Sequence, residues 1–263
     1  MNDLPIQLSD GLLTVTLNRP EKMNSVMAEM AHRLASIFRE AASNEDVRCL
    51  LVTGAGKAFC AGRDLSEARP GEDAYQIIST VFNPMLTALY EFPKPSISAI
   101  NGAAMGVGLG IALACDIVIA ADNARLSSPF ANLGVALDSG GHYHLPRMVG
   151  IHRALEMIYT ADVIRGKQAE AWGLVNRSVP GLKLAEWSRQ LGLRIAAGPT
   201  NAFVQQKRLA RESMQMGFGA VLESEARLQA ELVQMPEYAE GLAGFIEKRR
   251  PDFRSLRPQP KSR

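Results

Sequence analysis

The chain has 263 residues, of which 47% are hydrophobic and 21% charged, and its formal net charge at pH 7 is +2. This length and composition are typical of one large globular domain whose core needs no disulfide or metal for stability. The near balance of basic and acidic residues, with no long basic run before the tail, argues against a nucleic-acid partner.

The first half of the chain alternates between short apolar runs and helical patterns. Strands are predicted where such runs end in turn residues, over 12–17, 48–53, 96–100 and 116–120. After the first strand we expect a helix with Ser25 as its N-cap. Its apolar face predicts core packing and consists of Met27, Met30, Leu34, Ile37, Phe38 and Ala41. Parallel strands joined by helices, an α/β fold, are the interpretation.

The stretch 96–115 carries no charge, and three of its glycines repeat at the spacing used by membrane helix dimers. Against a membrane helix stand Pro93 and Pro95 before it, Asp116 after it, and its glycines, each of which costs a helix about 1 kcal/mol relative to alanine. We interpret the stretch as a strand, a glycine turn and a buried helix, and we expect no membrane partner.

The second half of the chain is predicted to be mainly helical. Gly173 and Gly198 stand where helices would stop. The predicted helices cover 151–160, 167–172, 184–197 and 201–232. The last has one apolar side, which would pack either on a neighbouring subunit or on the protein's own core. Residues 254–263 are polar and proline-bearing, so we expect a frayed tail.

Three cysteines, Cys49, Cys60 and Cys115, lie in or beside apolar segments without paired spacing, a pattern that predicts buried free thiols. The first residues, MNDLPIQLSD, lack the basic start and apolar centre of a secretory signal. We therefore expect a cytoplasmic protein.

Two glycine-rich stretches each follow a predicted strand: AFCAGRDL at 58–65 and NGAAMGVGLG at 101–110. Glycines at this density let the main chain turn sharply and present free N–H groups to a close neighbour. Two such turns, held side by side, can bind one oxyanion between them.

Six segments resemble the successive signatures of the crotonase superfamily, also called the enoyl-CoA hydratase/isomerase family. They are RPEKMNSV (19–26), KAFCAGRDL (57–65), KPSISAINGAAMGVGLGIALACDIVIA (94–120), FANLGVALDSGG (130–141), AEAWGLVN (169–176) and EGLAGFIEKRRPDF (240–253). The resemblance covers nearly the whole chain. It implies a superhelix of repeated ββα units over 1–200, a C-terminal helical trimerisation region over 201–263, and a homotrimer or a dimer of trimers.

The resemblance also implies the ligand, an acyl thioester of coenzyme A, with no permanently bound cofactor. The oxyanion hole of that family maps to the main-chain N–H groups of Arg63 and Val107. Val107 replaces the usual glycine and adds bulk. The family's coenzyme A contacts map to the main chain of Ala58, Phe59, Cys60 and Ala61 for adenine, and to Arg19, Lys22 and Lys248 for the phosphates. A solvated surface is the alternative role for these basic residues.

The acid–base residues narrow the choice among the reactions of the family. Hydratases of the family carry two glutamates, and the matching positions here are Gly110 and Phe130. Asp138 matches the proton carrier of the family's single-aspartate enoyl-CoA isomerases of the phenylacetate-pathway type. One carboxylate suits a proton shuttle between C2 and C4 of the acyl group, and the apolar Phe130 would raise its pKa. The alternative role of Asp138 is that of a turn residue.

Other side chains near Asp138 give weaker predictions. By resemblance, His142 and Phe82 belong to the acyl pocket with Gly110 and Phe130. We expect His142 and His144 to be hydrogen-bonded structural residues, since no third ligand with suitable spacing indicates a metal site. A hydrolase triad of Asp138, Ser139 and His142 is disfavoured, because neighbours in sequence rarely form one.

The sequence therefore predicts an isomerase that shifts a double bond, from Δ3 to Δ2 enoyl-CoA or in a ring-derived analogue. Three alternatives stay open: enoyl-CoA hydratase-like activity, an aryl-CoA dehalogenase with Asp138 as nucleophile, and a catalytically degenerate acyl-CoA-binding protein. The dehalogenases of the family carry a tryptophan where this chain has Phe130.

Overall fold

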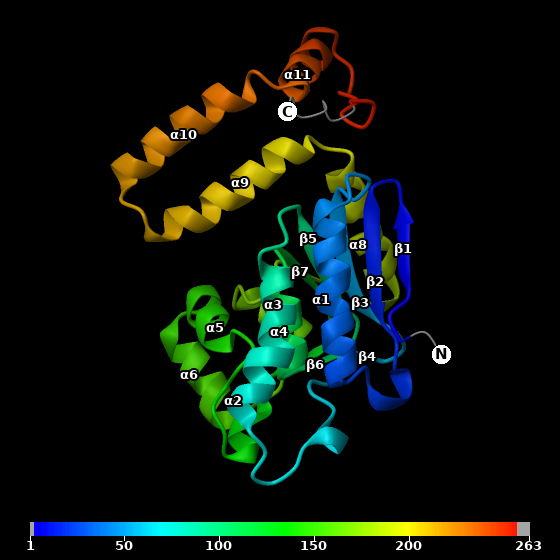
Figure 1. Ribbon diagram of the computed structural model, residues 1–263, viewed down its shortest axis with the longest axis vertical. Helices are drawn as coiled ribbons and strands as arrows, with labels where there is room; N and C mark the ends of the chain where they lie inside the picture. Colours follow the sequence, from blue (N-terminus) through cyan, green and yellow to red (C-terminus); the bar gives the residue numbers. More distant parts are fainter. Residues whose placement is uncertain (1–2, 257–263) are drawn as a thin grey trace.

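The computed structural model describes residues 3–256, which form two β-sheets surrounded by helices (Figure 1). The larger sheet has six strands in the order β1-β2-β3-β5-β7-β10. β1 is antiparallel to β2, and all other neighbours are parallel. Its strands are β1 (Ile6–Ser9), β2 (Leu12–Leu17), β3 (Cys49–Gly54), β5 (Ser96–Ile100), β7 (Ile117–Ala121) and β10 (Arg177–Val179). The four predicted strands lie within one residue of β2, β3, β5 and β7.

The smaller sheet has four strands in the order β4-β6-β8-β9. β4, β6 and β8 are parallel, and β9 is antiparallel to β8. Its strands are β4 (Ala58–Cys60), β6 (Ala103–Met105), β8 (Arg125–Ser127) and β9 (Ile164–Arg165). The sequence analysis predicted none of these strands separately, because two or three residues are too few for a periodic pattern.

Consecutive strands alternate between the two sheets. β3, β5 and β7 lie in the larger sheet, and the next strand of each pair, β4, β6 or β8, lies in the smaller sheet before the chain turns into helices. The predicted superhelix of repeated ββα units is therefore confirmed. The first six helices are α1 (Ala28–Ser43), α2 (Ala74–Ile77), α3 (Asn83–Tyr90), α4 (Val107–Ala114), α5 (Gly141–Val149) and α6 (Ile151–Thr160).

The predicted core stripe of α1 is confirmed, since Met30, Leu34 and Phe38 are buried in the main hydrophobic cluster. The prediction that Ser25 caps this helix is wrong. The helix begins at Ala28, and the Ser25 hydroxyl instead donates to Asp64, 3.2 Å away. A distant acceptor competes for the hydroxyl, which a local pattern cannot reveal.

The uncharged stretch 96–115 folds as β5, β6 and the eight-residue helix α4, all largely buried. Within residues 3–256, no helix is both long and apolar enough to cross a membrane. The buried free thiols are confirmed as well: Cys49, Cys60 and Cys115 are unpaired and buried, and burial raises the pKa of Cys49 and of Cys60 to about 12.

The remaining helices are α7 (Gly166–Ala171), α8 (Gly181–Ala196), α9 (Thr200–Glu212), α10 (Phe218–Leu232) and α11 (Pro236–Ile246). The prediction of one helix over 201–232 is wrong, because the helix is interrupted between α9 and α10. Met216 and Gly217 have extended main chains there, and Gly217 becomes the N-cap of α10. Glycine is a poor helix interior residue, which favours the break.

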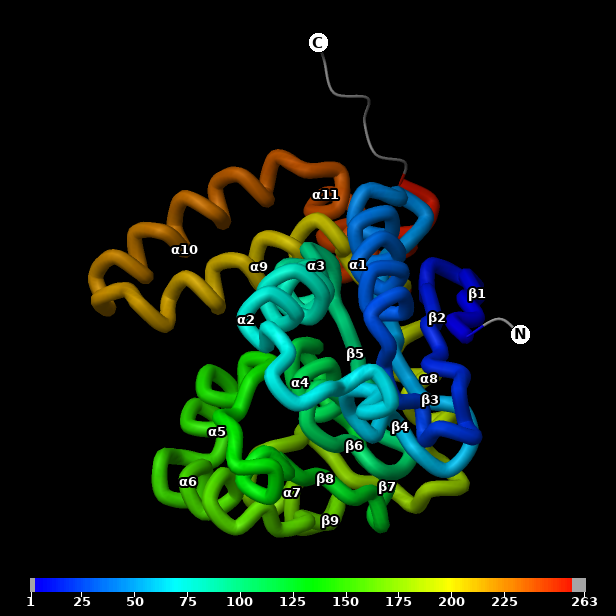
Figure 2. The backbone as a smooth tube through the Cα atoms, turned by 60° about the horizontal axis from the view of Figure 1, so that its bottom comes forward, coloured from blue at the N-terminus to red at the C-terminus, as the bar shows by residue number. Residues whose placement is uncertain are grey.

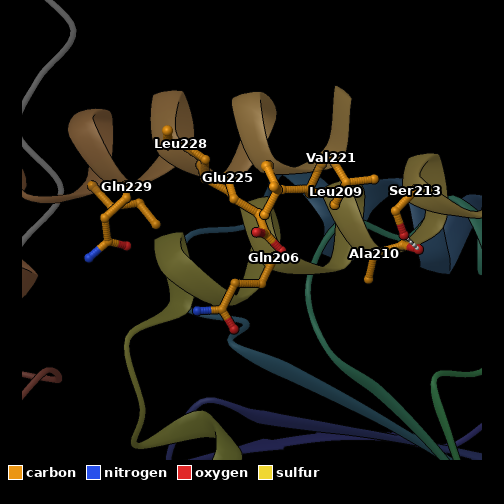
Figure 3. A pocket seen from close by; sticks show the side chains of 11 residues that line it. Gln206, Leu209, Ala210, Ser213, Val221, Glu225, Leu228 and Gln229 are labelled. Atoms are coloured by element: carbon orange, nitrogen blue, oxygen red, sulfur yellow. Dashed lines mark hydrogen bonds between the residues drawn. The ribbon is translucent and has the colours of Figure 1, made fainter. Parts of the chain in front are cut away.

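α9 and α10 lie side by side and extend away from both sheets (Figures 1 and 2). α10 has no buried residue, so the alternative that it packs on the protein's own core is wrong. The groove between the two helices is lined by apolar side chains such as Leu209, Val221 and Leu228 (Figure 3). Residues 257–263 of the predicted tail lie outside the described residues.

Asp116 ties α9 to the larger sheet. It lies at the start of β7, and its carboxylate accepts from Lys207 Nζ at 2.7 Å and from Arg211 Nη2 at 2.8 Å. Both cations belong to α9, so this double ion pair fixes the first helix of the projecting pair.

Candidate active site

The two glycine turns lie side by side because β4 pairs with β6, with Cys60 opposite Ala104. A Cβ atom on Gly62 would lie 2.9 Å from the Met105 carbonyl oxygen, and one on Gly108 would lie 2.2 Å from the Cys60 carbonyl oxygen. Real Cβ atoms do not approach main-chain oxygens so closely. The glycines therefore allow the two turns to pack directly on each other's main chain.

This packing places the two predicted oxyanion donors on adjacent turns. Val26 N–H donates to the Gly62 oxygen and Asp64 N–H donates to the Val26 oxygen, at 2.8 and 3.0 Å, so the bridge holds the two peptides that flank the Cα atom of Arg63, the first of which carries the Arg63 N–H. Val107 begins α4, where a helix leaves its first N–H groups without an intrahelical acceptor. Its side chain is 3% exposed and packs in the core, so the added bulk lies inside the protein.

Asp138 lines a small cavity together with Gly106 and Gly110 of the second glycine turn. The structure thus brings together Asp138 and the turn that it was predicted to face. Burial raises the pKa of the Asp138 carboxyl, while the Ser139 hydroxyl, which donates to Oδ1 at 2.6 Å, opposes that rise. A half-buried carboxylate with a raised pKa is suited to accept a proton from carbon.

Neither position that matches a hydratase glutamate carries an acid, and at Gly110 there is no room for one. A Cβ atom on Gly110 would lie 2.5 Å from Ser139 Cβ and 2.6 Å from the Ser139 carbonyl oxygen. A glutamate there would displace the turn that carries Asp138. Phe130 places its ring 3.6 Å from the position of a Cβ on Gly106, so it covers the second glycine turn with an apolar surface.

The Arg63 side chain also belongs to the site. Its guanidinium donates to both carboxylate oxygens of Glu72, with Nη2 to Oε2 at 2.8 Å. Its charge interacts with that of Asp138 and favours the ionised carboxylate there. Sequence reasoning used only the main chain of Arg63 and missed Glu72, which lies in a polar loop without a distinctive pattern.

Arg19 is placed inside the protein rather than toward solvent. It is 9% exposed, and it donates to the Ser25 oxygen at 2.7 Å and to Asp64 at 2.9 Å. The solvated-surface alternative is therefore wrong for Arg19, and its guanidinium is engaged within the turn rather than directed to a phosphate. Hydrogen bonds from Ser66 and then Arg19 lower the pKa of Asp64, consistent with its interpretation as a structural partner of the turn. Lys22 is exposed.

The predicted adenine segment is buried in β4, where Ala58, Phe59 and Cys60 are each at most 2% exposed. The Ala58 oxygen already accepts from the side-chain amides of Asn24 and Asn101, at 2.7 and 3.0 Å. Ala61 follows the strand and is half-buried. Lys248 comes just after α11, which lies at the top of the molecule in Figure 1, whereas β4 lies in its lower half. One chain therefore does not bring Lys248 to this segment.

The histidines occupy different surroundings. His142 is exposed on α5, whereas His144 is 7% exposed and lies edge-on to Tyr90 and Tyr143. Burial, followed by the nearby charges of Arg211 and Arg147, lowers the pKa of His144 to about 4. Because the Ser139 hydroxyl donates directly to Asp138, the triad interpretation is wrong. Among residues 3–256, no three His, Cys, Asp or Glu side chains come together as a metal site.

Phe82 was predicted to line the acyl pocket, but it is 3% exposed and belongs to the hydrophobic core. It does not line the cavity of Asp138. Ser128, which sequence reasoning missed, does line that cavity. Its hydroxyl is buried and has no hydrogen-bond partner within the described part of the chain.

Comparison with known proteins agrees with this arrangement. The family model described as enoyl-CoA hydratase/isomerase matches residues 7–257. A Rhodobacter capsulatus protein described as a probable enoyl-CoA hydratase is 38% identical, with 94% of this chain and 96% of the relative aligned. The 1,2-epoxyphenylacetyl-CoA isomerase of Escherichia coli is 36% identical, over 92% and 95% of the two chains. The crystal structure of an enoyl-CoA hydratase from Bacillus anthracis superposes with a TM-score of 0.91 at 31% identity, covering 97% of this chain and all of that one.

The match spans both sheets and both glycine turns, and the architecture is the predicted one. The chain belongs to the enoyl-CoA hydratase/isomerase family, the crotonase superfamily, whose signatures its sequence carries.

Proposed function

We propose that this protein is an acyl-CoA isomerase that moves a double bond, from the Δ3 to the Δ2 position of an enoyl-CoA or in a ring-derived analogue. The observation that carries the proposal is that, among the described residues, Asp138 is the only acid that lines this cavity. Asp138 shares a cavity with the second glycine turn, while Gly110 has no space for a second acid without movement of the Ser139 turn.

In the proposed reaction the thioester oxygen accepts hydrogen bonds from the main-chain N–H groups of Arg63 and Val107. The Asp138 carboxylate takes a proton from C2 or C4 of the acyl group, and the electron pair of the broken C–H bond moves into the conjugated enolate. The two N–H groups stabilise the negative charge on its oxygen. Asp138 then returns the proton at the other carbon, so atoms and charge balance.

Addition of water is the second candidate. The observation in its favour is the Ser128 hydroxyl, which lines the cavity of Asp138 and has no partner among residues 3–256. Such a hydroxyl, with Asp138, offers polar contacts for a water molecule. A panel of 3-enoyl-, 2-enoyl- and aryl-CoA thioesters separates the candidates. Isomerisation of 3-enoyl-CoA without net hydration of 2-enoyl-CoA supports the first.

Asp138→Asn tests the role of the carboxylate. We expect isomerisation to fall by about 100- to 10,000-fold, the range of positioned acid–base catalysis, with coenzyme A ligand binding retained. The matched control is Asp162→Asn, which replaces an exposed carboxylate in a loop. Retained activity in Asp138→Asn would refute the proposal.

Two further tests address the remaining alternatives. Exchange of the C2 proton of a saturated acyl-CoA in deuterated water reports proton removal directly, and its absence at every chain length favours a degenerate binding protein. Covalent trapping of Asp138 by an aryl-CoA favours the dehalogenase.

We also propose that the chain forms a homotrimer or a dimer of trimers through its C-terminal helices. Supporting this, α10 and α11 expose large apolar side chains, with Phe218 79% and Phe245 82% exposed. Sedimentation velocity measures the state directly, and a monomer at micromolar concentration would contradict the proposal.

For coenzyme A we propose that Lys22 lies toward the phosphates together with Lys248 of the partner subunit in the proposed oligomer, and that the main chain around Ala61 borders the adenine. Lys22→Ala and Lys248→Ala should then raise KM with little change in kcat, because phosphate contacts are the same in substrate and transition state.

A further inference from the structure

The turn after β4 carries more than the proposed main-chain donor, because it also carries a cation whose charge acts on the candidate proton carrier. Gly62 packs on Met105, and Gly106 lines the cavity of Asp138, so Arg63 follows the point where the two turns meet. The Arg63 side chain is 20% exposed, and its charge interacts with that of Asp138. A guanidinium without a partner of its own would attract the carboxylate more than one held in an ion pair does.

In the structure that guanidinium is instead occupied by Glu72. Both carboxylate oxygens of Glu72 accept from Arg63, the two-point geometry that makes arginine–carboxylate pairs strong. Glu72 is held by its own loop, since Oε2 also accepts from Arg69 N–H at 3.2 Å and Glu72 N–H donates to the Arg69 oxygen. The loop 69–72 therefore holds the Glu72 carboxylate in place for the ion pair with Arg63.

We propose that Glu72 is a positioning residue that holds the Arg63 guanidinium in this ion pair and thereby keeps it from pairing with Asp138. The inference rests on the role proposed for Asp138. It adds a condition for that role: an ion pair with Arg63 would lower the basicity of the carboxylate that must take a proton from carbon.

Few other charges act on this arrangement. Glu67 is the other acid whose charge reaches Arg63. At Asp138 the interacting groups are Arg63 and the Ser139 hydroxyl. The other residues that line the cavity, Ser128 apart, are leucines and glycines from the segments around α4 and α5. Among residues 3–256, Arg63 is therefore the one cation whose charge acts on Asp138, and Glu72 is its two-point partner.

The test is the titration of Asp138 in the free protein, followed by NMR of ¹³C-labelled aspartate and assigned with Asp138→Asn. Glu72→Gln keeps an acceptor for Arg69 N–H but removes the charge. We expect it to lower the titration midpoint of Asp138 by about one pH unit or more, because an unpaired cation then faces the carboxylate. Arg63→Gln, which keeps its main-chain N–H, should raise the midpoint, and the double variant should match Arg63→Gln.

The same series gives a kinetic readout. Glu72→Gln should lower kcat about tenfold, the factor that corresponds to one pKa unit, and Arg63→Gln in the double variant should restore it. A merely structural role for Glu72 would give no such rescue. Glu223→Gln, which breaks the exposed Glu223–Arg227 pair on α10, is the matched control and should leave the titration unchanged.

An unchanged midpoint in Glu72→Gln, or a double variant that behaves like Glu72→Gln alone, would overturn the proposal. The titration requires no substrate. An enzyme that fails to isomerise any thioester would therefore overturn the proposed function and leave the titration result standing, so the two failures are distinguishable.

Discussion

The two sheets of this protein differ in what they contribute. The larger sheet has long central strands such as β5 (Ser96–Ile100), in which every residue is buried. The strands of the smaller sheet have two or three residues each, yet β4 and β6 lead directly into both glycine turns. The comparison indicates that stability and site geometry reside in different parts of one fold. Variants in each sheet can separate the two.

The largest effect on stability is expected in the larger sheet. Ile97 lies in β5 and is fully buried. Ile97→Ala removes three carbon atoms from a close-packed core and should lower the free energy of unfolding by about 4 kcal/mol. Urea denaturation measures this loss. Activity per folded molecule should stay near that of the parent protein, and a large loss of activity would show that the sheets are not separable.

The matching variant is Gly108→Ala in α4, at the point where this helix packs on β4 of the smaller sheet. Its Cβ would lie 2.2 Å from the Cys60 oxygen, so the two turns must move apart. Because this changes the spacing of the two N–H donors, we expect kcat to fall by about 100-fold or more. Gly219→Ala in α10, where nothing lies within 4 Å of the added atom, is the control. Steady-state kinetics of both variants show whether activity is lost because of the contact with Cys60 or because of any exchange of glycine for alanine.

The third prediction concerns pH. Burial raises the pKa of Asp138 above its ordinary value of 3.8. Because the base must be ionised, kcat should fall as the pH drops through the raised pKa, tenfold per unit below it. In the window between 3.8 and that raised value, the folded state binds more protons than the unfolded state, so this group's contribution to stability decreases as the pH rises.

Asp138→Asn removes that dependence. The thermal midpoint of the variant minus that of the parent protein should therefore be larger at pH 7 than at pH 3. Scanning calorimetry at the two pH values checks the sign. An equal difference at both would mean that the fold does not raise the pKa of this carboxyl.

The smallest effect is expected at Ser128. Its buried hydroxyl lacks a partner among residues 3–256, so removing it relieves a desolvation cost. Ser128→Ala should change the free energy of unfolding by at most about 1 kcal/mol, in the stabilising direction. A clear destabilisation would indicate that a bound water satisfies the hydroxyl. High-resolution crystallography of the parent protein would then locate that water.

The strands of the larger sheet could be predicted from the sequence, whereas those of the smaller sheet could not. β2, β3, β5 and β7 were predicted within a residue because each is an apolar run bounded by turn residues. The strands of the smaller sheet were missed, since a run such as Ala103–Met105 resembles the glycine-rich turn around it. Its position becomes evident only when β6 pairs with β4 and β8.

In the candidate site, too, only the residues that belong to a local sequence motif could be predicted. Asp138 and the two turns were predicted because a motif carries them. Arg19 and Phe82 were assigned ligand contacts, yet one is held in a buried ion pair and the other packs in the core. Glu72 was missed because its partner lies nine residues away in a loop, where no periodicity links the two. A local sequence pattern does not indicate which contacts form only when the chain folds.

The direct packing of Gly108 on Cys60 has a consequence for how such proteins diversify. The two donors proposed for the thioester oxygen belong to the main chain, so a single exchange at either position deletes its N–H only when the new residue is proline. Side chains at positions such as 110, 130 and 138 can therefore change while the two proposed donors stay in place. A new activity can therefore arise by moving one carboxylate, which makes this architecture a favourable starting point for directed evolution toward other thioester reactions.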